Sequence, residues 1–382
     1  MIIQETYELN IFVDGVNIFE APGIILLSAE IIEAIDNPIP SCELRLSVPL
    51  GWFNERSFVD GTLLRFEIKD PKQNLYEDLR FRLFDIEEVN INQNFVVVQF
   101  DGVLDFHEGY REANYLNQYS TSSDLFKHIA STFKLKNDID NTNDLQLWVA
   151  GENNLYQFMT KTAEYGWEDD TSAMFWCFDR HKVLLYKNLT TLFRRRSDNI
   201  GTFIQQGLKT DAKNKIYSYV EAQGYIQSGY ENLANQGYGG EDHYFDLLSY
   251  QWKEVTARKV IAESNLINIS KELSNGLAQS WYPFNVGNFH DHYYLAYKQN
   301  KRILSTYSSY VNLSCSYFMP YRLGQIVNFH YTDSQDDEIK VRALSGVFAI
   351  CAIKIKINTR SITCNLQLMM QGLNGTAARE TY

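Results

Sequence analysis

The sequence predicts an α+β fold that is mainly β: two similar small antiparallel β-barrels with inserted α/β domains. Three observations lead to this prediction. Residues 6–105 are short runs of alternating apolar and polar residues joined by polar turns, with no long helical pattern. A similar succession of runs returns in residues 308–369. The clearest helical spacing of apolar residues falls between these regions, in residues 121–166.

Length and composition narrow the class of protein. The chain has 382 residues, more than one ordinary hydrophobic core needs, so we expect two or three domains. Hydrophobic residues make up 45% and charged residues 21%, which is typical of a globular protein. The formal net charge of −12 argues against a nucleic-acid-binding protein, which would carry a basic surface, and against docking on anionic lipid.

Cysteine usage and the apolar pattern indicate where the chain is made. The five cysteines are scattered without CxxC spacing and mostly fall in predicted strands, so we interpret them as core residues in a reducing compartment. They are Cys42, Cys177, Cys315, Cys351 and Cys364. The N-terminus lacks a signal-peptide pattern, and no apolar run approaches the roughly 20 residues of a membrane helix. We therefore expect a soluble protein made in a cytoplasm.

Residues 1–110 are predicted to form the first barrel. Tyr7–Val13 alternates between apolar and polar residues and runs into a turn at Asp14–Gly15. Further strands are expected at residues 44–48, 63–68, 81–91 and 95–100. Because these strands are short and joined by polar turns, we expect them to be antiparallel.

Residues 111–200 are predicted to form a helix-strand-helix-hairpin insert. Ser122 and Ser123 can accept hydrogen bonds from the free N–H groups of a first helix, and Gly166 suits the left-handed position after a second one. The expected elements are a helix from Ser122 to Phe133, a polar loop at residues 136–144, a strand at 145–149, a helix from Asn153 or Asn154 to Gly166, and strands at 173–178 and 183–186 joined by a turn at 179–182.

The rest of the chain divides into three segments. They are a second barrel (residues 201–229 and 308–374), a partly helical insertion within it (230–307) and a C-terminal tail (375–382). In the insertion, apolar residues recur at helical spacing in Leu266–Leu273 and in Asp291–Leu304. We therefore expect two helices there.

The second barrel repeats the pattern of the first, which predicts an internal duplication. Gly61–Ile68 has the layout of Gly324–Tyr331: a glycine precedes a short strand, and an acidic turn, a long apolar alternation and a last strand follow. The strand ahead of each block also matches, with Leu44–Ser47 against Val311–Ser314. Chance similarity explains any one pair of strands, but four elements in the same order favour duplication.

Histidines and glycines offer weak candidates for a site. His290 and His292 are two residues apart, and His330 is a possible third metal ligand. Residues two apart lie on one face of a strand but not of a helix, and this segment has the pattern of a helix start, so a solvated or interface pair is favoured. Gly237–Glu241 lacks the Lys-Ser/Thr of a phosphate-binding loop, and we interpret it as a loop tip.

Charged clusters do not indicate catalysis either. Arg194–Arg196 is the one basic cluster, and in an acidic chain we expect it to pair with acidic patches of this chain or of a partner. Glu168–Asp170 and Asp336–Glu338 are acidic runs in predicted turns, which lack the apolar cleft that raises the pKa of a glycosidase acid. We therefore predict no enzymatic activity, no catalytic or metal-binding residues, no cofactor and no assignable binding residues.

The order of elements resembles one family. The helix that ends in Ala163–Gly166, with the aromatic strand and hairpin after it, is similar to the insert domain of baseplate hub proteins of contractile-tailed, T-even-like phages. The run Met319–Val327, followed by Ser345–Phe348 and Met369–Gly372, is also similar to their C-terminal region. The hub part of type VI secretion VgrG spike proteins belongs to the same superfamily.

The resemblance implies a structural protein of the virion. A homotrimer would place six similar barrels around one axis, so that the ring fits the hexameric tail tube on one face and the trimeric central spike on the other. The implied partners are tube or tube-initiator proteins, the spike, the tape measure and peripheral baseplate proteins. DNA would pass through the ring without specific binding, between acidic walls that the net charge of −12 suggests. The implied location is the tail baseplate, assembled in the host cytoplasm without a membrane.

Two alternative functions stay open. A tail-tip hub of a long-tailed phage or of a contractile injection system would have the same architecture. A carbohydrate-binding tail-tip module would use exposed aromatic rings, and tryptophans are dispersed at Trp52, Trp148, Trp167, Trp252 and Trp281. Because the sequence ends at Tyr382, soon after the second barrel, we expect the spike to be a separate polypeptide.

Overall fold

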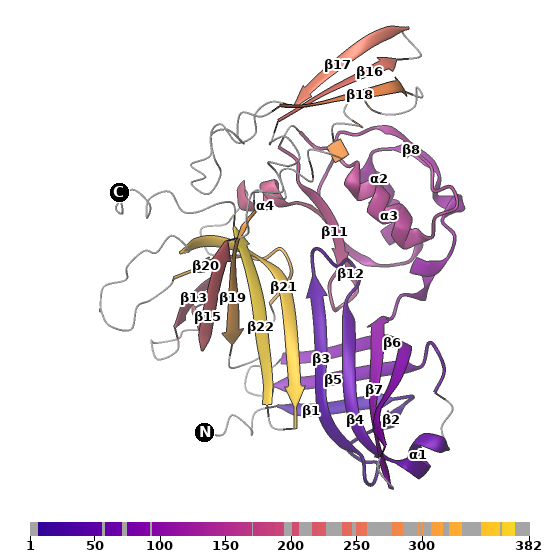
Figure 1. Ribbon diagram of the computed structural model, residues 1–382, viewed down its shortest axis with the longest axis vertical. Coiled ribbons are helices and arrows are strands. Elements are labelled where there is room, and N and C mark those ends of the chain that lie inside the picture. Colours follow the sequence, from indigo (N-terminus) through magenta and orange to yellow (C-terminus); the bar gives the residue numbers. More distant parts are fainter. Residues whose placement is uncertain are drawn as a thin grey trace.

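The computed structural model shows a mainly β protein with helices in its insert, as the sequence predicts (Figure 1). It describes residues 7–370 apart from residues 56–57, 71–74, 92–93, 170, 195–200, 206–215, 227–238, 247–249, 258–276, 286–289, 291–292, 294–295, 298–299, 301–306, 316–320, 331–344 and 360. Most strands belong to one 14-stranded sheet. Within the described residues, no helix has the length and apolar character needed to cross a membrane.

Seven strands form the first half of the large sheet. They are β1 (Glu8–Val13), β2 (Val16–Asn17), β3 (Ile25–Ala34), β4 (Ser41–Pro49), β5 (Leu63–Asp70), β6 (Leu75–Ile91) and β7 (Phe95–Leu104), with a short helix α1 (Leu50–Asn54) after β4. Their order is β3-β4-β7-β6-β5-β1-β2, and neighbours are antiparallel. From Cys42 to Val48 every second residue is buried, because alternate side chains of a strand lie on one face.

The insert carries most of the helices. Its elements are the 3-10 turns η1 (His107–Tyr110) and η2 (Asn114–Leu116), strands β8 (Gln118–Ser120), β9 (Lys136–Ile139), β10 (Gln146–Trp148), β11 (Met174–Phe178) and β12 (Val183–Asn188), and helices α2 (Ser122–Thr132), α3 (Leu155–Glu164) and α4 (Leu189–Arg194). β11, β12 and β9 form one sheet, and β10 pairs with β8. The predicted order of helix, strand, helix and hairpin is therefore observed.

Three local predictions in the insert are wrong. Thr121, and not Ser122 or Ser123, caps α2 by accepting a hydrogen bond from the backbone N–H of Asp124. Residues 136–139 are a strand instead of a loop, because β9 pairs in parallel with β12. Gly166 does not have the positive φ of a left-handed residue; instead, a Cβ there would lie 2.0 Å from the Tyr186 hydroxyl, so close packing requires the glycine.

Seven further strands form the second half of the large sheet. They are β13 (Gly201–Gln205), β14 (Ile216–Tyr219), β15 (Glu221–Ile226), β19 (Ser309–Cys315), β20 (Ile326–Phe329), β21 (Gly346–Asn358) and β22 (Ser361–Met370). Their order is β15-β19-β22-β21-β20-β13-β14. β13 is parallel to both of its neighbours, and the other neighbours are antiparallel.

The insertion between β15 and β19 contains a separate sheet, at the top of Figure 1. Its strands are β16 (Gly239–Asp246), β17 (Gln251–Ala257) and β18 (Leu277–Asn285), in the order β17-β16-β18. These strands were not expected in a segment predicted to be partly helical. The helix predicted around Leu266–Leu273 lies outside the described residues. Of the helix predicted at Asp291–Leu304, the described residues Tyr293, Ala296, Tyr297 and Asn300 are helical.

The prediction of two closed barrels is wrong, because the sheets are not closed into barrels. The edge of β3 that could close the first half instead pairs with β21, antiparallel, from Ala34↔Ala352 to Ala29↔Ile357. The two halves therefore form one continuous sheet. The second half curves strongly, since β14 and β15 stand at opposite ends of its strand order but are separated in sequence only by Val220.

The two halves nevertheless have the same strand order, which confirms their predicted similarity. β3-β4-β7-β6-β5 in the first half corresponds to β15-β19-β22-β21-β20 in the second. The next strand differs, because β1 is antiparallel to β5 whereas β13 is parallel to β20. The register places Leu44 of β4 in the position of Leu313 of β19, so the predicted match with Val311 is wrong by two residues.

The corners before β5 and β20 are alike down to single hydrogen bonds. The N–H of Gly61 donates to the Leu83 carbonyl at 2.7 Å, and the N–H of Gly324 donates to the Ile350 carbonyl at 2.9 Å. Both glycines have positive φ, +84° and +73°. This conformation favours glycine over residues with a Cβ. The predicted correspondence of the two glycines is therefore confirmed.

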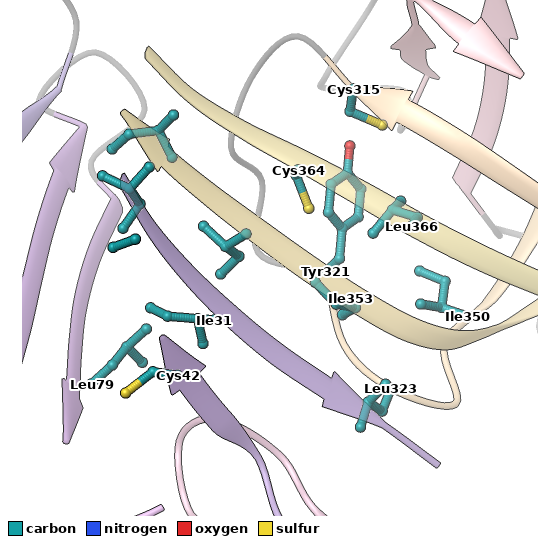
Figure 2. Packing of buried hydrophobic residues seen from close by; sticks show 14 of the residues in the cluster. Ile31, Cys42, Leu79, Cys315, Tyr321, Leu323, Ile350, Ile353, Cys364 and Leu366 are labelled. Carbon is teal, nitrogen blue, oxygen red and sulfur yellow. The ribbon is translucent and has the colours of Figure 1, made fainter. Parts of the chain in front are cut away.

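The main apolar core spans both halves of the sheet, and a second core lies inside the insert. Figure 2 shows Tyr321 between strands of the second half, with its hydroxyl directed toward Cys315 and with Cys364 and Leu366 nearby. The five cysteines are all free, buried and part of the main core. Their interpretation as small core residues is confirmed.

Candidate functional site

The histidines considered as metal ligands lie in separate places. His290 is buried against the insert, where its Nε2 lies 3.3 Å from the Tyr165 carbonyl oxygen and its backbone N–H donates to Gln146. His330 lies at the end of β20, where its backbone N–H donates to Phe203. His292 is outside the described residues. Within the described part of the chain, no three His, Cys, Asp or Glu residues are placed to hold a metal ion.

The basic and acidic runs meet each other. Nη1 of Arg194 lies 3.6 Å from the Asp169 carboxylate, and Nη2 of Arg194 donates to the Thr171 hydroxyl at 3.0 Å. Glu168 accepts hydrogen bonds from Asn188 and Thr191. The predicted pairing of the basic cluster with an acidic patch is thus confirmed for Arg194. The other residues of these runs lie outside the described residues: Arg195, Arg196, Asp170 and Asp336–Glu338. Of the predicted loop tip at Gly237–Glu241, the first two residues also lie outside them, and the prediction is wrong for Gly239–Glu241, which begins strand β16.

The structure brings together a buried charge cluster that the sequence did not indicate. Arg180, in the turn between β11 and β12, reaches the large sheet: its Nη1 lies 2.5 Å from Oε1 of Glu33 in β3, and its Nη2 lies 3.3 Å from Oε1 of Glu77 in β6. The backbone N–H of Arg180 also donates to Glu33, at 2.5 Å. All three side chains are at most 2% exposed. This cluster joins the insert to the first half.

The same guanidinium reaches the second half. Nη1 of Arg180 donates to the backbone carbonyl of Tyr321 at 2.9 Å. Tyr321 lies in the segment before β20 and is itself buried. A single side chain therefore bonds to all three parts of the chain: the insert that carries it and both halves of the sheet.

The turn that presents Arg180 is built by its neighbours. The Asp179 carboxylate accepts from the backbone N–H groups of His181 at 2.9 Å and Val183 at 2.8 Å. Lys182 has a φ of 62°, in the left-handed region. A side chain that caps its own turn in this way fixes the direction of the residues within it. The predicted turn at residues 179–182 is confirmed, but its inward-facing arginine was missed.

Burial and charge act against each other in the cluster. Burial raises the pKa of Glu33, although the charge of Arg180 opposes this rise. For Glu77, burial alone would raise the pKa, but the hydrogen bond from His181 and the charge of Arg180 leave it below its usual value. Nε2 of His181 lies 2.9 Å from Oε2 of Glu77. Because removing one member leaves an uncompensated buried charge, the cluster strongly favours one arrangement of the three parts.

The ladder between β3 and β21 is the second junction between the halves. On its polar face, the ammonium groups of Lys354 and Lys356 both pair with the Glu30 carboxylate, the latter at 3.7 Å. Backbone hydrogen bonds of the ladder hold the two halves edge to edge, and the ion pairs across it match lysines on β21 to a glutamate on β3.

The insertion docks on the insert through Asn300. Its Nδ2 donates to the carbonyls of Glu164 and Gly166, both at 3.0 Å, and its Oδ1 accepts from the Met174 N–H at 3.2 Å. The last carbonyls of a helix have no N–H donor within the helix, and Asn300 supplies one to Glu164 at the C-terminal end of α3. Beside them the rings of Tyr165 and Tyr293 stack at 4.1 Å. A cavity of about 500 Å³ lies between the two segments.

The chain shares its fold with tail proteins of known structure. The tail protein from Neisseria meningitidis MC58 superposes with a TM-score of 0.56 and 9% identity, over 96% of this chain and 98% of that chain. The 43 kDa tail protein of prophage MuSo2 from Shewanella oneidensis superposes with a TM-score of 0.57 and 10% identity, over 95% of this chain and 96% of that chain. No protein-family model and no curated protein matches the sequence.

These comparisons confirm the predicted resemblance at the level of the fold: the chain has the fold of tail proteins. At 9% and 10% identity, the likeness to these two tail proteins is one of fold. The Arg180 cluster and the β3–β21 ladder hold the two similar sheet halves and the insert together.

Proposed function

We propose that this protein is the structural hub of a phage tail baseplate, a homotrimeric ring of pseudo-sixfold symmetry that adapts the hexameric tail tube to the trimeric central spike. The observation that carries the proposal is the pair of sheet halves with the same strand order, joined edge to edge within one chain. The ring modules are residues 1–110 and residues 201–229 with 308–374. The tail-protein fold supports this assignment.

The mechanism is geometric. Three copies of a chain with two similar modules give six modules around a threefold axis, so the ring offers six near-equivalent positions to one neighbour and three equivalent positions to the other. The Arg180 cluster and the β3–β21 ladder fix the angle between the modules of one chain. That angle must be constant if a ring of six is to close.

The partners follow from this geometry. The tail tube or a tube-initiator protein binds one face of the ring and the spike binds the other, with the tape measure and peripheral baseplate proteins as further neighbours. The protein resides in the virion after assembly in the host cytoplasm. DNA passes through without specific binding. On the polar face of the first half, basic side chains lie in ion pairs with carboxylates, as in Arg65–Glu67 at 2.6 Å and Arg65–Asp78 at 2.8 Å, which weakens their attraction for phosphate.

Electron microscopy of the purified protein tests the proposal. We expect particles with three chains and six similar densities around one axis, with a mass by light scattering of three times that of one chain. Addition of the trimeric spike should give a complex of one ring with one spike. A monomer that stays monomeric with spike and tube proteins present, or a ring of another order, would refute the adaptor.

A tail-tip carbohydrate-binding module is the second candidate, and one observation favours it. The β16–β17 hairpin exposes Tyr250 (78%) and Trp252 (61%), and the ring of Phe245 packs edge-on against Trp252 at 5.6 Å. Exposed aromatic rings of this kind stack on sugars. Binding on a glycan array that is lost in Trp252→Ala would favour this function, whereas spike capture without glycan binding favours the hub. A hub of a long-tailed phage or contractile injection system would differ only in its neighbours.

A further inference from the structure

Each of the two strand edges that meet at the junction between the halves has an equivalent elsewhere in the chain that is left unpaired within the described residues. Within one chain, β3 of the first half pairs with β21 of the second half. Because the halves share one strand order, β15 stands in the position of β3, and β6 stands in the position of β21. An edge like that of β3 and an edge like that of β21 are therefore present once more.

Irregularities in the strands support this equivalence residue by residue. β6 has two extra residues against β7, at positions 84 and 89, and β21 has one against β22, Cys351; the first bulge of β6, at Phe84, matches that of β21. β3 has one extra residue, Leu27, against β4, and Val220 interrupts the chain between β14 and β15 at the matching place. β-bulges bend strands in a specific way, so their shared positions are a strong sign of shared geometry.

Both remaining edges are open within the described residues. The ladder of β5 ends where Leu63 pairs with Arg82, so beyond that point β6 pairs with β7 alone. β15 pairs with β19 alone. Phe84 is 54% exposed and Tyr225 is 40% exposed. Long open edges in a folded chain invite pairing with another chain.

We propose that β15 of one copy pairs with the edge of β6 beyond Arg82 in the next copy, which repeats between chains the β3–β21 ladder found within each chain. This inference rests on the homotrimer proposed above and supplies the contact that closes it. Six ladders, three within chains and three between them, would then alternate around the ring. The sheet would continue through all three chains.

The equivalence also predicts the register. Within the chain, Lys354 of β21 lies opposite Ile32 of β3. Glu87 holds the position of Lys354, because Glu87 is the third residue after the bulge at Phe84 and Lys354 is the third residue after the bulge at Cys351. Tyr225 of β15 holds the position of Ile32 of β3, because the residues with which they pair on β19 and β4 are at matching positions. Glu87 of one copy should therefore lie opposite Tyr225 of the next.

Side-chain chemistry at this register is compatible. Within the chain, the lysines of β21 pair with Glu30 of β3. In the proposed ladder, Glu87 takes the place of Lys354 and Gln223 takes the place of Glu30. A carboxylate thus meets an amide that can donate to it, and no two carboxylates face each other. In the proposed ladder the acceptor is on β6 and the donor is on β15, whereas within the chain the donors are on β21 and the acceptor is on β3. The two strands are therefore still complementary.

Disulfide trapping tests the ladder in the full chain. In the double variant Glu87→Cys, Tyr225→Cys, mild oxidation should give disulfide-linked dimers and trimers on a non-reducing denaturing gel, which disappear with reductant. The five native cysteines are buried and should not contribute. The matched control is Glu88→Cys, Tyr225→Cys. There the thiol on β6 moves by one residue and lies on the opposite face of the strand, so we expect at least tenfold less linked product.

The outcomes separate this inference from the proposed function. Trimers by light scattering that do not cross-link in Glu87→Cys, Tyr225→Cys would refute the ladder and leave the homotrimer standing. Equal linkage in the shifted control would also refute it, because collision and not register would then explain the product. A chain that is monomeric and unlinked at every concentration tested would count against both.

A charge variant gives an independent measurement. Gln223→Glu places a second carboxylate near Glu87 and should weaken the trimer several-fold in its dissociation constant. Adding Glu87→Lys to that variant recreates the ion pair that Lys354 and Glu30 form within the chain, and should restore or tighten the trimer. An equal effect of Gln223→Glu with either residue at position 87 would contradict the predicted contact.

Discussion

Arg180 and Glu33 form an ion pair of 2.5 Å in which both side chains are 1% exposed, although they come from different parts of the fold. Arg180 sits in a turn of the insert, and Glu33 sits at the end of the strand that joins the two halves of the sheet. The pair therefore lies where the insert meets the joint between the halves. Changes at this point should affect the whole chain and not one domain.

Replacing Arg180 should be strongly destabilising. Arg180→Met leaves two buried carboxylates, Glu33 and Glu77, without their shared partner, and we expect a loss of about 3–5 kcal/mol in the free energy of unfolding. Denaturant unfolding measures it. The matched control is Arg45→Met, which removes an arginine 43% exposed in its ion pair with Glu43 and should cost about 0–1 kcal/mol. Similar losses in the two variants would contradict the central role of Arg180.

Stability should depend on the ionisation of Glu77. Its pKa is lowered in the folded chain, so the ionised form is favoured by folding, and this contribution is complete above the usual value of 4.5 and is lost as the pH falls through the folded value. The wild-type protein should therefore lose stability relative to Glu77→Gln as the pH falls below 4.5. Denaturant unfolding from neutral to acidic pH measures the difference. His181→Asn removes the hydrogen bond to Glu77 and should flatten the dependence; an unchanged slope would argue against that bond.

Gly166 should tolerate no side chain. In Gly166→Ala the new Cβ would lie 2.0 Å from the Tyr186 hydroxyl, so the surrounding core must shift, and we expect a loss of about 1–3 kcal/mol. Thermal unfolding measures the change. Tyr186→Phe removes the clashing hydroxyl and should recover part of the loss when combined with Gly166→Ala. Gly51→Ala is the control: no atom lies within 4 Å of its Cβ position, and a helical alanine there should leave stability equal or higher.

Asn300 should hold the insertion on the insert. Asn300→Ala removes the donor to the carbonyls of Glu164 and Gly166 and the acceptor of the Met174 N–H, and we expect a loss of about 1–3 kcal/mol. Hydrogen exchange should show faster exchange of the Met174 amide. Asn143→Ala is the matched control, because its exposed side chain donates to the Glu168 carbonyl at the surface. Unchanged protection at Met174 would mean that the docking does not depend on Asn300.

The elements that sequence predicted well have strong local signals. The sequence predicts the second insert helix, and within it Phe158 is 2% exposed. The corner glycines were found because a positive φ restricts the choice of residue. The match of Leu44 with Val311 was wrong by two residues for a physical reason: strand faces repeat every two residues, so such a shift leaves the apolar pattern unchanged.

The features that sequence missed depend on distant partners. β9 reads as a loop because Lys136–Asp138 is polar, and it becomes a strand only by pairing with β12. β3 and β21 alternate like any strands, so nothing local shows that they pair with each other and not within their own halves. Arg180 reads as an exposed turn residue, and only the fold brings Glu33 to it across 147 residues. The sequence therefore does not predict the Arg180 cluster, although it predicts the insert and the two sheet halves that the cluster joins.

The two corner glycines should respond alike to substitution, because their backbone conformations and hydrogen bonds are alike. Gly61 and Gly324 have φ of +84° and +73°, and a Cβ at either would meet no atom closer than 3.4 Å, so the cost of alanine comes from the backbone alone. We expect Gly61→Ala and Gly324→Ala each to lose about 1–2 kcal/mol by denaturant unfolding, and asparagine, which adopts this conformation more readily, to lose less at both positions. A large loss at one glycine and none at the other would mean that the two corners are alike in geometry but not in energetics. Equal losses would support the view that both halves depend on the same corner, as six near-equivalent modules of one ring require.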